Sequence, residues 1–128
     1  MVYFLFLDDK YREYRNPDTY CRDSTMVPFK VQITEKIGDM PWVLVDSYEA
    51  FKTALDRYGI PYGVSFDHDL GINSDGTEKT GKDCANLLAH KCLDEGVNFP
   101  HYFIHTDNIP GRYNIQSVID SFIKVKNM

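Results

Sequence analysis

The sequence predicts a doubly wound α/β fold, in which helices cover both faces of a parallel β-sheet. Short, continuously apolar segments alternate along the chain with segments whose apolar residues recur at helical spacing. Continuous hydrophobicity is typical of strands that are buried on both faces, as in parallel sheets. Groups of polar residues that contain carboxylates or an imidazole follow the apolar segments at Asp8-Asp9, at Asp67 to Asp69 and at His105-Thr106. Because the carboxyl ends of parallel strands share one edge of the sheet, these polar residues indicate a common site.

The chain has 128 residues, which suits one domain over residues 1–128. A chain of this size buries roughly 70% of its unfolded surface. An apolar fraction of 43% argues against global disorder. The formal net charge of -5 argues against an extended surface for long nucleic acid. It still allows a nucleotide or an RNA end as ligand, if a cation offsets the acids.

The cysteines and the amino-terminal residues predict the compartment. Cys21, Cys84 and Cys92 are an odd number without CxxC spacing, which favours a reducing compartment and no zinc cluster. The apolar segment at residues 2–7 is too short for a signal-peptide core or a membrane span. We therefore expect a cytoplasmic protein that does not contact the membrane.

The first strand is expected over residues 2–7, where six apolar residues follow one another. Residues 10–41 are polar and charged, and we expect them to form an irregular insertion without a helix. Only residues 29–35 alternate between apolar and polar, which predicts a peripheral strand. The role of the insertion stays open between a lid, a partner surface and a spacer.

Residues 42–45 predict the second strand, and residues 62–67 the third. Asp46 or Ser47 can cap the helix between them, and Gly59 ends it. The buried side of this helix carries apolar residues at helical spacing: Tyr48, Phe51, Leu55 and Tyr58.

A further helix is expected to begin at Thr80, with Asp83 as its reciprocal capping partner. Its inner face carries Cys84, Leu87, Leu88 and Cys92. Residues 101–105 predict the fourth strand. The apolar spacing predicts a final helix that starts near Asn114.

Carboxylates at two strand ends predict a metal site. Asp8 and Asp9 follow the first strand, and Asp67 ends the third. Carboxylate oxygens suit Mg²⁺ or Mn²⁺, and without a cation packed carboxylates would raise one another's pKa. Asp69 is a further candidate ligand through its carbonyl or side chain. The alternatives are a solvated turn at Asp8 and Asp9 and a turn residue at Asp69.

Two histidines stand beside these acids. His68 lies between Asp67 and Asp69 and fits a proton donor or a phosphate contact, with a loop histidine as the alternative. His105, Thr106 and Asn108 would bring an imidazole, a hydroxyl and a carboxamide to the same rim. The alternative there is a core histidine followed by a turn. Gly111 would allow a tight turn close to the ligand.

Thr80 and Gly81 begin a helix whose first amides are candidates for binding phosphate, although helix capping explains the same residues. The chain has no GxxxxGK[ST] loop, no GxGxxG after a strand and no GxSxG. The common nucleotide-triphosphatase, dinucleotide and hydrolase motifs are therefore missing from it.

The sequence resembles the cyclic-phosphate processing receiver domains, a receiver-derived family of bacterial and phage proteins. The motifs that carry the resemblance are Leu7-Asp8-Asp9, Asp67-His68-Asp69-Leu70-Gly71, Thr80-Gly81 and His105-Thr106-Asp107-Asn108-Ile109-Pro110-Gly111. Residues 1–9 and 42–124 match. Where the family tends to have an arginine after the acid pair, this chain has Tyr11. Thr106 replaces a serine, the late proline has moved by one place, and residues 10–41 are longer than the usual connection.

The resemblance implies a receiver-like (flavodoxin-like) sheet that is truncated after the fourth main strand. It implies that Asp8, Asp9 and Asp67 bind a cation and that His68 and His105, with Asp67, act on a phosphate ester. We therefore expect a metal-dependent phosphoesterase of the cytoplasm of a bacterium or a phage-infected cell. Its substrate would be an RNA 2',3'-cyclic phosphate end or a cyclic nucleotide, held by Thr80, Gly81, Thr106 and Asn108.

Two alternatives differ in class from this enzyme. The first is a non-catalytic, receiver-like module that binds a nucleotide or a partner protein. The second is a phospho-accepting receiver that uses Asp67, which ranks last because the chain ends without the fifth strand and lysine of an ordinary receiver.

Overall fold

The computed structural model describes residues 1–11, 15–20, 27–70, 76 and 78–127. Its strands are β1 (Phe4–Leu7), β2 (Trp42–Val45), β3 (Gly63–Phe66) and β4 (His101–Ile104). Its helices are α1 (Phe29–Ile37), α2 (Tyr48–Tyr58), α3 (Gly81–Glu95) and α4 (Ile109–Lys126). Among the described helices, none is both long enough and apolar enough to cross a lipid bilayer.

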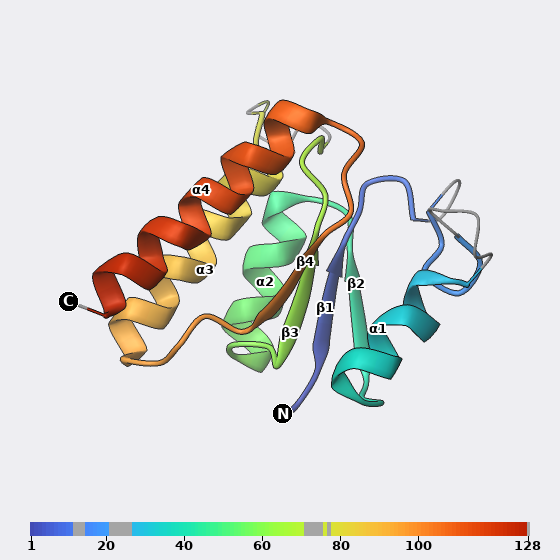
Figure 1. Cartoon of the computed structure of the whole chain (residues 1–128), viewed down its shortest axis with the longest axis horizontal. Coiled ribbons are helices and arrows are strands. Elements are labelled where there is room, and N and C mark those ends of the chain that lie inside the picture. Colours follow the sequence, from blue (N-terminus) through green and yellow to red (C-terminus); the bar gives the residue numbers. More distant parts are fainter. Residues whose placement is uncertain (12–14, 21–26, 71–75, 77, 128) are drawn as a thin grey trace.

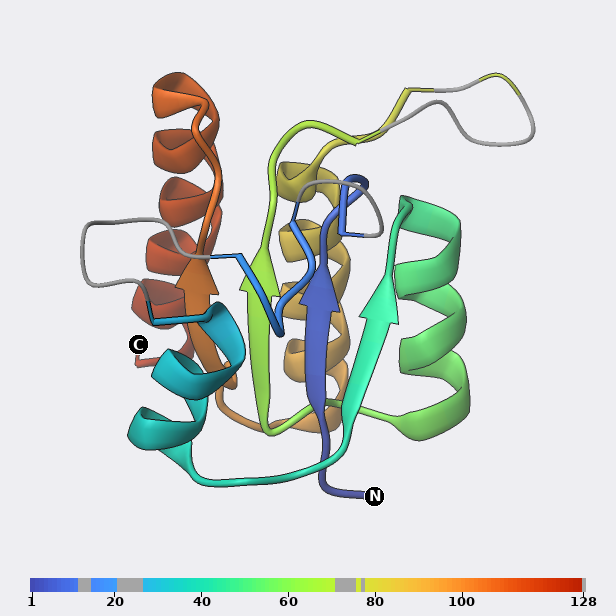
Figure 2. The ribbon, with the colours of Figure 1, turned by 90° about the vertical axis from the view of Figure 1, so that its right-hand side faces the viewer.

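The four strands form one parallel sheet in the order β2-β1-β3-β4. The predicted parallel α/β sheet is thus confirmed, and all four predicted main strands are present. In Figure 2 the four arrows point the same way, so the carboxyl ends lie together at the edge opposite the amino terminus. That edge brings the segments after β1, β3 and β4 close to one another, because β1 and β4 both pair with β3.

The side chains of β1 alternate between two cores. Leu5 and Leu7 face the larger core, which α2, α3 and α4 cover, whereas Phe4 and Phe6 face a smaller core under α1. Figure 1 shows α2, α3 and α4 on one side of the sheet and α1 on the other. Because all of β1 is buried, both faces of the central strand need apolar residues. This explains the continuous hydrophobicity of the segment.

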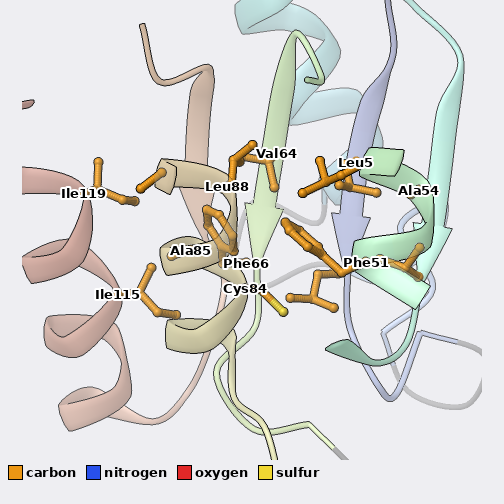
Figure 3. Close-up of a cluster of buried hydrophobic side chains, with 14 of the residues drawn as sticks. Leu5, Phe51, Ala54, Val64, Phe66, Cys84, Ala85, Leu88, Ile115 and Ile119 are labelled. Carbon is orange, nitrogen blue, oxygen red and sulfur yellow. The ribbon is translucent and has the colours of Figure 1, made fainter. Parts of the chain in front are cut away.

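The larger core holds α2, α3 and α4 against the sheet, and the loops after β3 and β4 lead into α3 and α4. Figure 3 shows it as a layer of side chains between the sheet and these helices. The labelled residues include Val64 and Phe66 of β3, Phe51 of α2, Leu88 of α3, and Ile115 and Ile119 of α4. Burying a side chain of this size stabilises the fold by about 1.5–3 kcal/mol.

The prediction of a strand over residues 29–35, in an insertion without a helix, is wrong. Phe29 and Ile33 are buried one helical turn apart in α1, and Ile37 packs beside them against the smaller core. Phe29 contacts Phe6, with ring centroids 6.3 Å apart. The apolar residues of this short segment fit one side of a strand and also one side of a helix. The helix forms because it buries Phe29 and Ile33 against the sheet.

The last helix, α4, begins at Ile109 and not near Asn114. Asn108 caps it, because its Oδ1 atom accepts a hydrogen bond of 2.8 Å from the amide of Gly111. Pro110 fits the first turn, where its missing N–H costs nothing. Gly111 therefore lies in the first turn of a helix, and the prediction of a tight loop turn there is wrong.

Candidate functional site

Two carboxylates and an imidazole meet at the carboxyl edge of the sheet. One ligand atom each from Asp8, Asp67 and His105 lies within 4.8 Å of the other two, and we call these residues the edge cluster. All three side chains are buried. The Oδ1 atom of Asp8 accepts a 2.7 Å bond from the amide of Lys10, and Oδ1 of Asp67 accepts a 2.9 Å bond from the amide of His68. The strand ends thus converge as the sequence predicts.

His105 is held through both of its ring nitrogens. Nε2 lies 3.0 Å from Oδ2 of Asp8, and Nδ1 lies 2.6 Å from Oγ of Ser65. The ring also stacks on Phe6, with centroids 4.7 Å apart and planes 7° apart. A carboxylate only accepts hydrogen bonds, so Nε2 carries the proton that is shared with Asp8. This arrangement fixes the position of the Asp8 carboxylate.

Ser65 belongs to the site, although the sequence did not predict it there. It lies inside β3 and is buried. A buried hydroxyl needs a partner, and His105 supplies it from the neighbouring strand. A single polar residue inside an otherwise apolar strand was the available signal.

The electrostatics of the edge cluster disfavour a charged Asp67. Burial is the largest cause, and the neighbouring Asp8 and Asp9 carboxylates add to it, whereas Arg15 opposes it. Together they raise the pKa of Asp67 to about 7. Burial and the charge of Asp8 also raise the pKa of Asp9. A cation at this edge would relieve the repulsion and favour the ionised acids.

Arg15 is a member of the site that sequence reasoning missed. Its Nη1 atom lies 3.3 Å from Oδ1 of Asp67 and 3.7 Å from Oδ2 of Asp8. Its Nη2 atom donates a 2.7 Å hydrogen bond to Oδ2 of Asp107. Burial disfavours the guanidinium cation, but the carboxylates of Asp67, Asp8 and Asp107 outweigh that effect and raise the pKa of Arg15. No local pattern signals this contact, because Arg15 lies in a polar loop far from Asp67 in the sequence.

A second group of polar residues lies at the start of α4. Nδ1 of His68 is 3.1 Å from Oδ1 of Asp69, and Nδ2 of Asn108 donates to both Asp69 oxygens at 3.2 and 3.3 Å. The Asp69 side chain is 68% exposed and faces His68 and Asn108. The structure thus joins these three predicted residues to one another, and it does not place Asp69 in the edge cluster.

Thr106 is buried between these two groups. Its Oγ1 atom accepts a 3.1 Å hydrogen bond from the amide of Asn108, and its carbonyl accepts one of 3.3 Å from Arg112. The Thr106 hydroxyl therefore shapes the loop that leads from β4 into α4.

The predicted capping box at the start of α3 is confirmed. The Thr80 amide donates a 2.7 Å hydrogen bond to Oδ2 of Asp83. The next amide, of Gly81, donates a 2.8 Å bond to the carbonyl of His68. Both of these amides thus have protein partners, and a phosphate contact at Thr80 and Gly81 stays a prediction.

Two glycines let helix starts approach the loop after β3. A Cβ atom on Gly81 would lie 1.8 Å from the carbonyl oxygen of Asp67. A Cβ atom on Gly111 would lie 2.3 Å from Cγ of His68. The first turns of α3 and α4 therefore confine the backbone of Asp67 and the ring of His68. This close approach explains the glycines in both motifs.

The donor set of the edge fits a hard divalent cation. Asp8 and Asp67 supply oxygens that lie close together, and Asp9 adds a third carboxylate whose side chain interacts with that of Asp67. Mg²⁺ and Mn²⁺ prefer such ligands, usually one or two carboxylates together with water and phosphate oxygens. The imidazole of His105 is engaged by Asp8 and Ser65, so the carboxylates are the better candidates.

Comparison with protein families matches residues 3–121 to the cyclic-phosphate processing receiver domain. Searches among curated proteins and among solved structures give no match to this chain. The matched segment includes all four strands and the edge cluster. It also agrees with the receiver-like, flavodoxin-like arrangement of the parallel sheet. The chain therefore belongs to the cyclic-phosphate processing receiver domain family.

Proposed function

We propose that this protein is a metal-dependent phosphoesterase that opens a cyclic phosphate, either at the 2',3'-cyclic end of an RNA or in a cyclic nucleotide. The family description, cyclic-phosphate processing, supports the substrate class. The observation that carries the proposal is the pair of buried carboxylates, Asp8 and Asp67, side by side at the sheet edge. Buried acids with a raised pKa are costly to a fold and are concentrated at functional sites.

Asp8 and Asp67, with Asp9, would hold Mg²⁺ or Mn²⁺. Such an ion supplies Lewis-acid stabilisation of phosphate oxygens and lowers the pKa of a water that it binds. Asp8 is already fixed by His105 and by the amide of Lys10, so its carboxylate needs little reorganisation to bind a ligand. We accordingly assign His105 to positioning Asp8.

His68 is the residue that we assign to proton transfer. Its ring is confined by Gly111, and Nδ1 lies 3.1 Å from Oδ1 of Asp69, so this carboxylate can orient the imidazole. In the reaction, a water oxygen bonds to phosphorus while the bond from phosphorus to one ribose oxygen breaks. The water loses a proton and the ribose oxygen gains one, so the product is a phosphate monoester. Asn108 and the start of α3 at Thr80 and Gly81 would contact phosphate or ribose.

Turnover of defined cyclic phosphates tests this proposal. The substrates are 2',3'-cyclic AMP, 3',5'-cyclic AMP and a short RNA with a 2',3'-cyclic end, each with Mg²⁺, Mn²⁺ or EDTA and followed by phosphorus NMR. The expected result is cation-dependent formation of a monoester that Asp67→Asn reduces by about 100-fold or more. Asp94→Asn, which changes an exposed acid on α3, is the matched control. Absence of turnover on the whole panel would remove the enzymatic proposal.

A binding module without catalysis is the second candidate. Both ring nitrogens of His105 have partners within the protein, and Arg15 forms an ion pair with Asp67. Such a network can stabilise one conformation of the site without taking part in a reaction. A module of this kind would bind a nucleotide or a partner protein. It predicts that a cyclic nucleotide raises the melting temperature while the NMR assay detects no product. His68→Ala would then leave the ligand's dissociation constant within about two-fold.

A further inference from the structure

The side chain of Arg15 makes ion pairs with three acids from different parts of the chain. Nη1 contacts Asp67 at 3.3 Å and Asp8 at 3.7 Å, whereas Nη2 contacts Asp107 at 2.7 Å. The Arg15 side chain is 17% exposed, and Asp107 is 65% exposed. One end of the guanidinium thus lies among buried carboxylates and the other lies at the solvent rim.

The backbone around Arg15 is anchored on both sides. The Arg15 amide donates a 2.9 Å hydrogen bond to the carbonyl of Lys10, just after β1. Further along, the carbonyl of Tyr20 accepts a 3.1 Å bond from the amide of Phe29, the first residue of α1, and the two rings lie 5.0 Å apart. The segment that carries Arg15 is therefore tied to both β1 and α1. These backbone contacts help to hold Arg15 where its side chain reaches Asp8, Asp67 and Asp107.

The oxygens that Arg15 contacts belong to the two carboxylates that we assign to the cation. A guanidinium and a divalent cation repel each other, and both are attracted by the same pair of negative charges. Once a cation neutralises Asp8 and Asp67, the attraction that holds Nη1 there is lost. The contact of Nη2 with Asp107 involves neither of those acids, so it can keep the side chain at the rim.

We propose that Arg15 is an internal counter-ion of the edge cluster, that a divalent cation displaces it from Asp8 and Asp67, and that the displaced guanidinium binds the phosphate of the substrate. This inference rests on the proposed function, because it takes the cation site from there. It adds a substrate-positioning residue that lies outside the matched motifs. Arginine suits this task, because its planar guanidinium can form paired hydrogen bonds with a carboxylate or with a phosphate.

Binding measurements on the apo protein test the inference without an activity assay. Mn²⁺ binding is measured from the loss of the free-ion EPR signal, and inorganic phosphate binding by calorimetry at saturating Mn²⁺. Arg15→Gln should bind Mn²⁺ about five-fold more tightly, since the competing charge is gone. The same variant should bind phosphate about ten-fold more weakly. Arg15→Lys keeps the charge without the fork and should affect phosphate binding more than Mn²⁺ binding.

Arg57→Gln is the matched control, because it makes the same charge change on the exposed face at the end of α2. It should leave both dissociation constants within about two-fold. Arg15→Gln is also compared with the parent protein in EDTA, where loss of the counter-ion should lower the melting temperature and Mn²⁺ should restore it.

The possible results separate the inference from the proposed function. Tighter Mn²⁺ binding together with weaker phosphate binding in Arg15→Gln supports the inference. If the parent protein binds Mn²⁺ in an Asp67-dependent way but Arg15→Gln leaves its affinity unchanged or lowers it, the inference is overturned and the cation site stands. If neither the parent protein nor Arg15→Gln binds Mn²⁺, both are overturned.

Discussion

The imidazole of His105 and the carboxylate of Asp8 form a buried hydrogen-bonded pair, with Nε2 and Oδ2 3.0 Å apart, although the residues are 97 positions apart in the chain. Ser65 completes the pair on the other ring nitrogen. Two buried polar side chains, Asp8 and Ser65, therefore share the imidazole of His105 as a partner. Since an unpaired buried polar group costs about 1–3 kcal/mol, the imidazole is important to stability as well as to the site.

We predict that His105→Ala lowers the free energy of unfolding by about 3–4 kcal/mol, because it removes the imidazole partner of Oδ2 of Asp8 and of the Ser65 hydroxyl and opens a cavity beside Phe6. Urea denaturation measures the change. His105→Gln, which can still donate to Asp8, should lose less stability than His105→Ala. A loss below about 1 kcal/mol in His105→Ala would show that the pair does not hold the edge together.

The raised pKa of Asp67 predicts how the stability of the cation-free protein depends on pH. The pKa of Asp67 is about 7 in the folded protein, against an ordinary value of 3.8. Between these two pH values the folded protein keeps a proton on Asp67 that the unfolded chain releases. This contribution to stability is full below about pH 4 and is lost as the pH rises through about 7. In EDTA, the free energy of unfolding that comes from this group should therefore fall between these pH values.

Asp67→Asn provides the corresponding test, because the amide resembles the protonated acid. At pH 8 in EDTA it should raise the free energy of unfolding by about 2 kcal/mol, and the gain should shrink towards pH 4. Asp94→Asn should show no such pH-dependent gain. A destabilised Asp67→Asn at pH 8 would mean that the ion pair with Arg15 outweighs the burial of Asp67.

The contact between Gly111 and His68 predicts an effect of Gly111→Ala. The new methyl group would overlap the His68 ring, because a Cβ atom at this position would lie 2.3 Å from Cγ of His68. We expect a loss of about 1–3 kcal/mol in urea denaturation and a displaced imidazole in the ¹H–¹⁵N spectrum. Adding His68→Ala removes the overlapping ring but keeps the Cβ atom of residue 68, which would lie 2.7 Å from the new methyl group. Gly111→Ala should therefore cost less stability in the His68→Ala background than in the parent protein. Additive losses in the double variant would contradict this contact.

Asn108 combines two roles that substitutions can separate. Its Oδ1 atom caps α4 through Gly111, and its Nδ2 atom holds Asp69. Asn108→Ala should cost about 1 kcal/mol of stability through the lost cap. Asn108→Ser keeps a capping oxygen and should recover most of that stability, but it should not recover turnover of a cyclic phosphate if the amide also orients the site. If Asn108→Ser recovered stability and turnover equally, Asn108 would serve only to cap α4.

The sequence predicted the sheet well because burial on both faces leaves a strong local signal. Residues 42–45, for example, are continuously apolar and form β2 over the same bounds. The failure over residues 29–35 has a physical cause. Val31 and Ile33 are β-branched and alternate with polar residues, as in a strand, whereas the helical partners Phe29 and Ile33 become apparent only when Phe6 is known to lie beneath them.

The site was partly predictable for a similar reason. Asp8 and Asp67 end strands that pair with each other, so topology brings them together once the strands are placed. Arg15 and Ser65 carried no comparable signal. Arg15 reaches Asp67 from a loop whose path depends on contacts with α1, and the importance of Ser65 depends on the ring of His105 in the next strand.

A crystal structure of the protein grown with Mn²⁺ and inorganic phosphate tests the central claim most directly, through the anomalous scattering of Mn²⁺. We predict one anomalous peak at the sheet edge, with carboxylate oxygens of Asp8 and Asp67 about 2.2 Å from the ion and phosphate beside it. Asp67→Asn crystals grown in the same way should lose the peak. A Mn²⁺-saturated crystal with no peak at coordinating distance from Asp8, Asp9 or Asp67 would contradict the claim that these acids form a cation site.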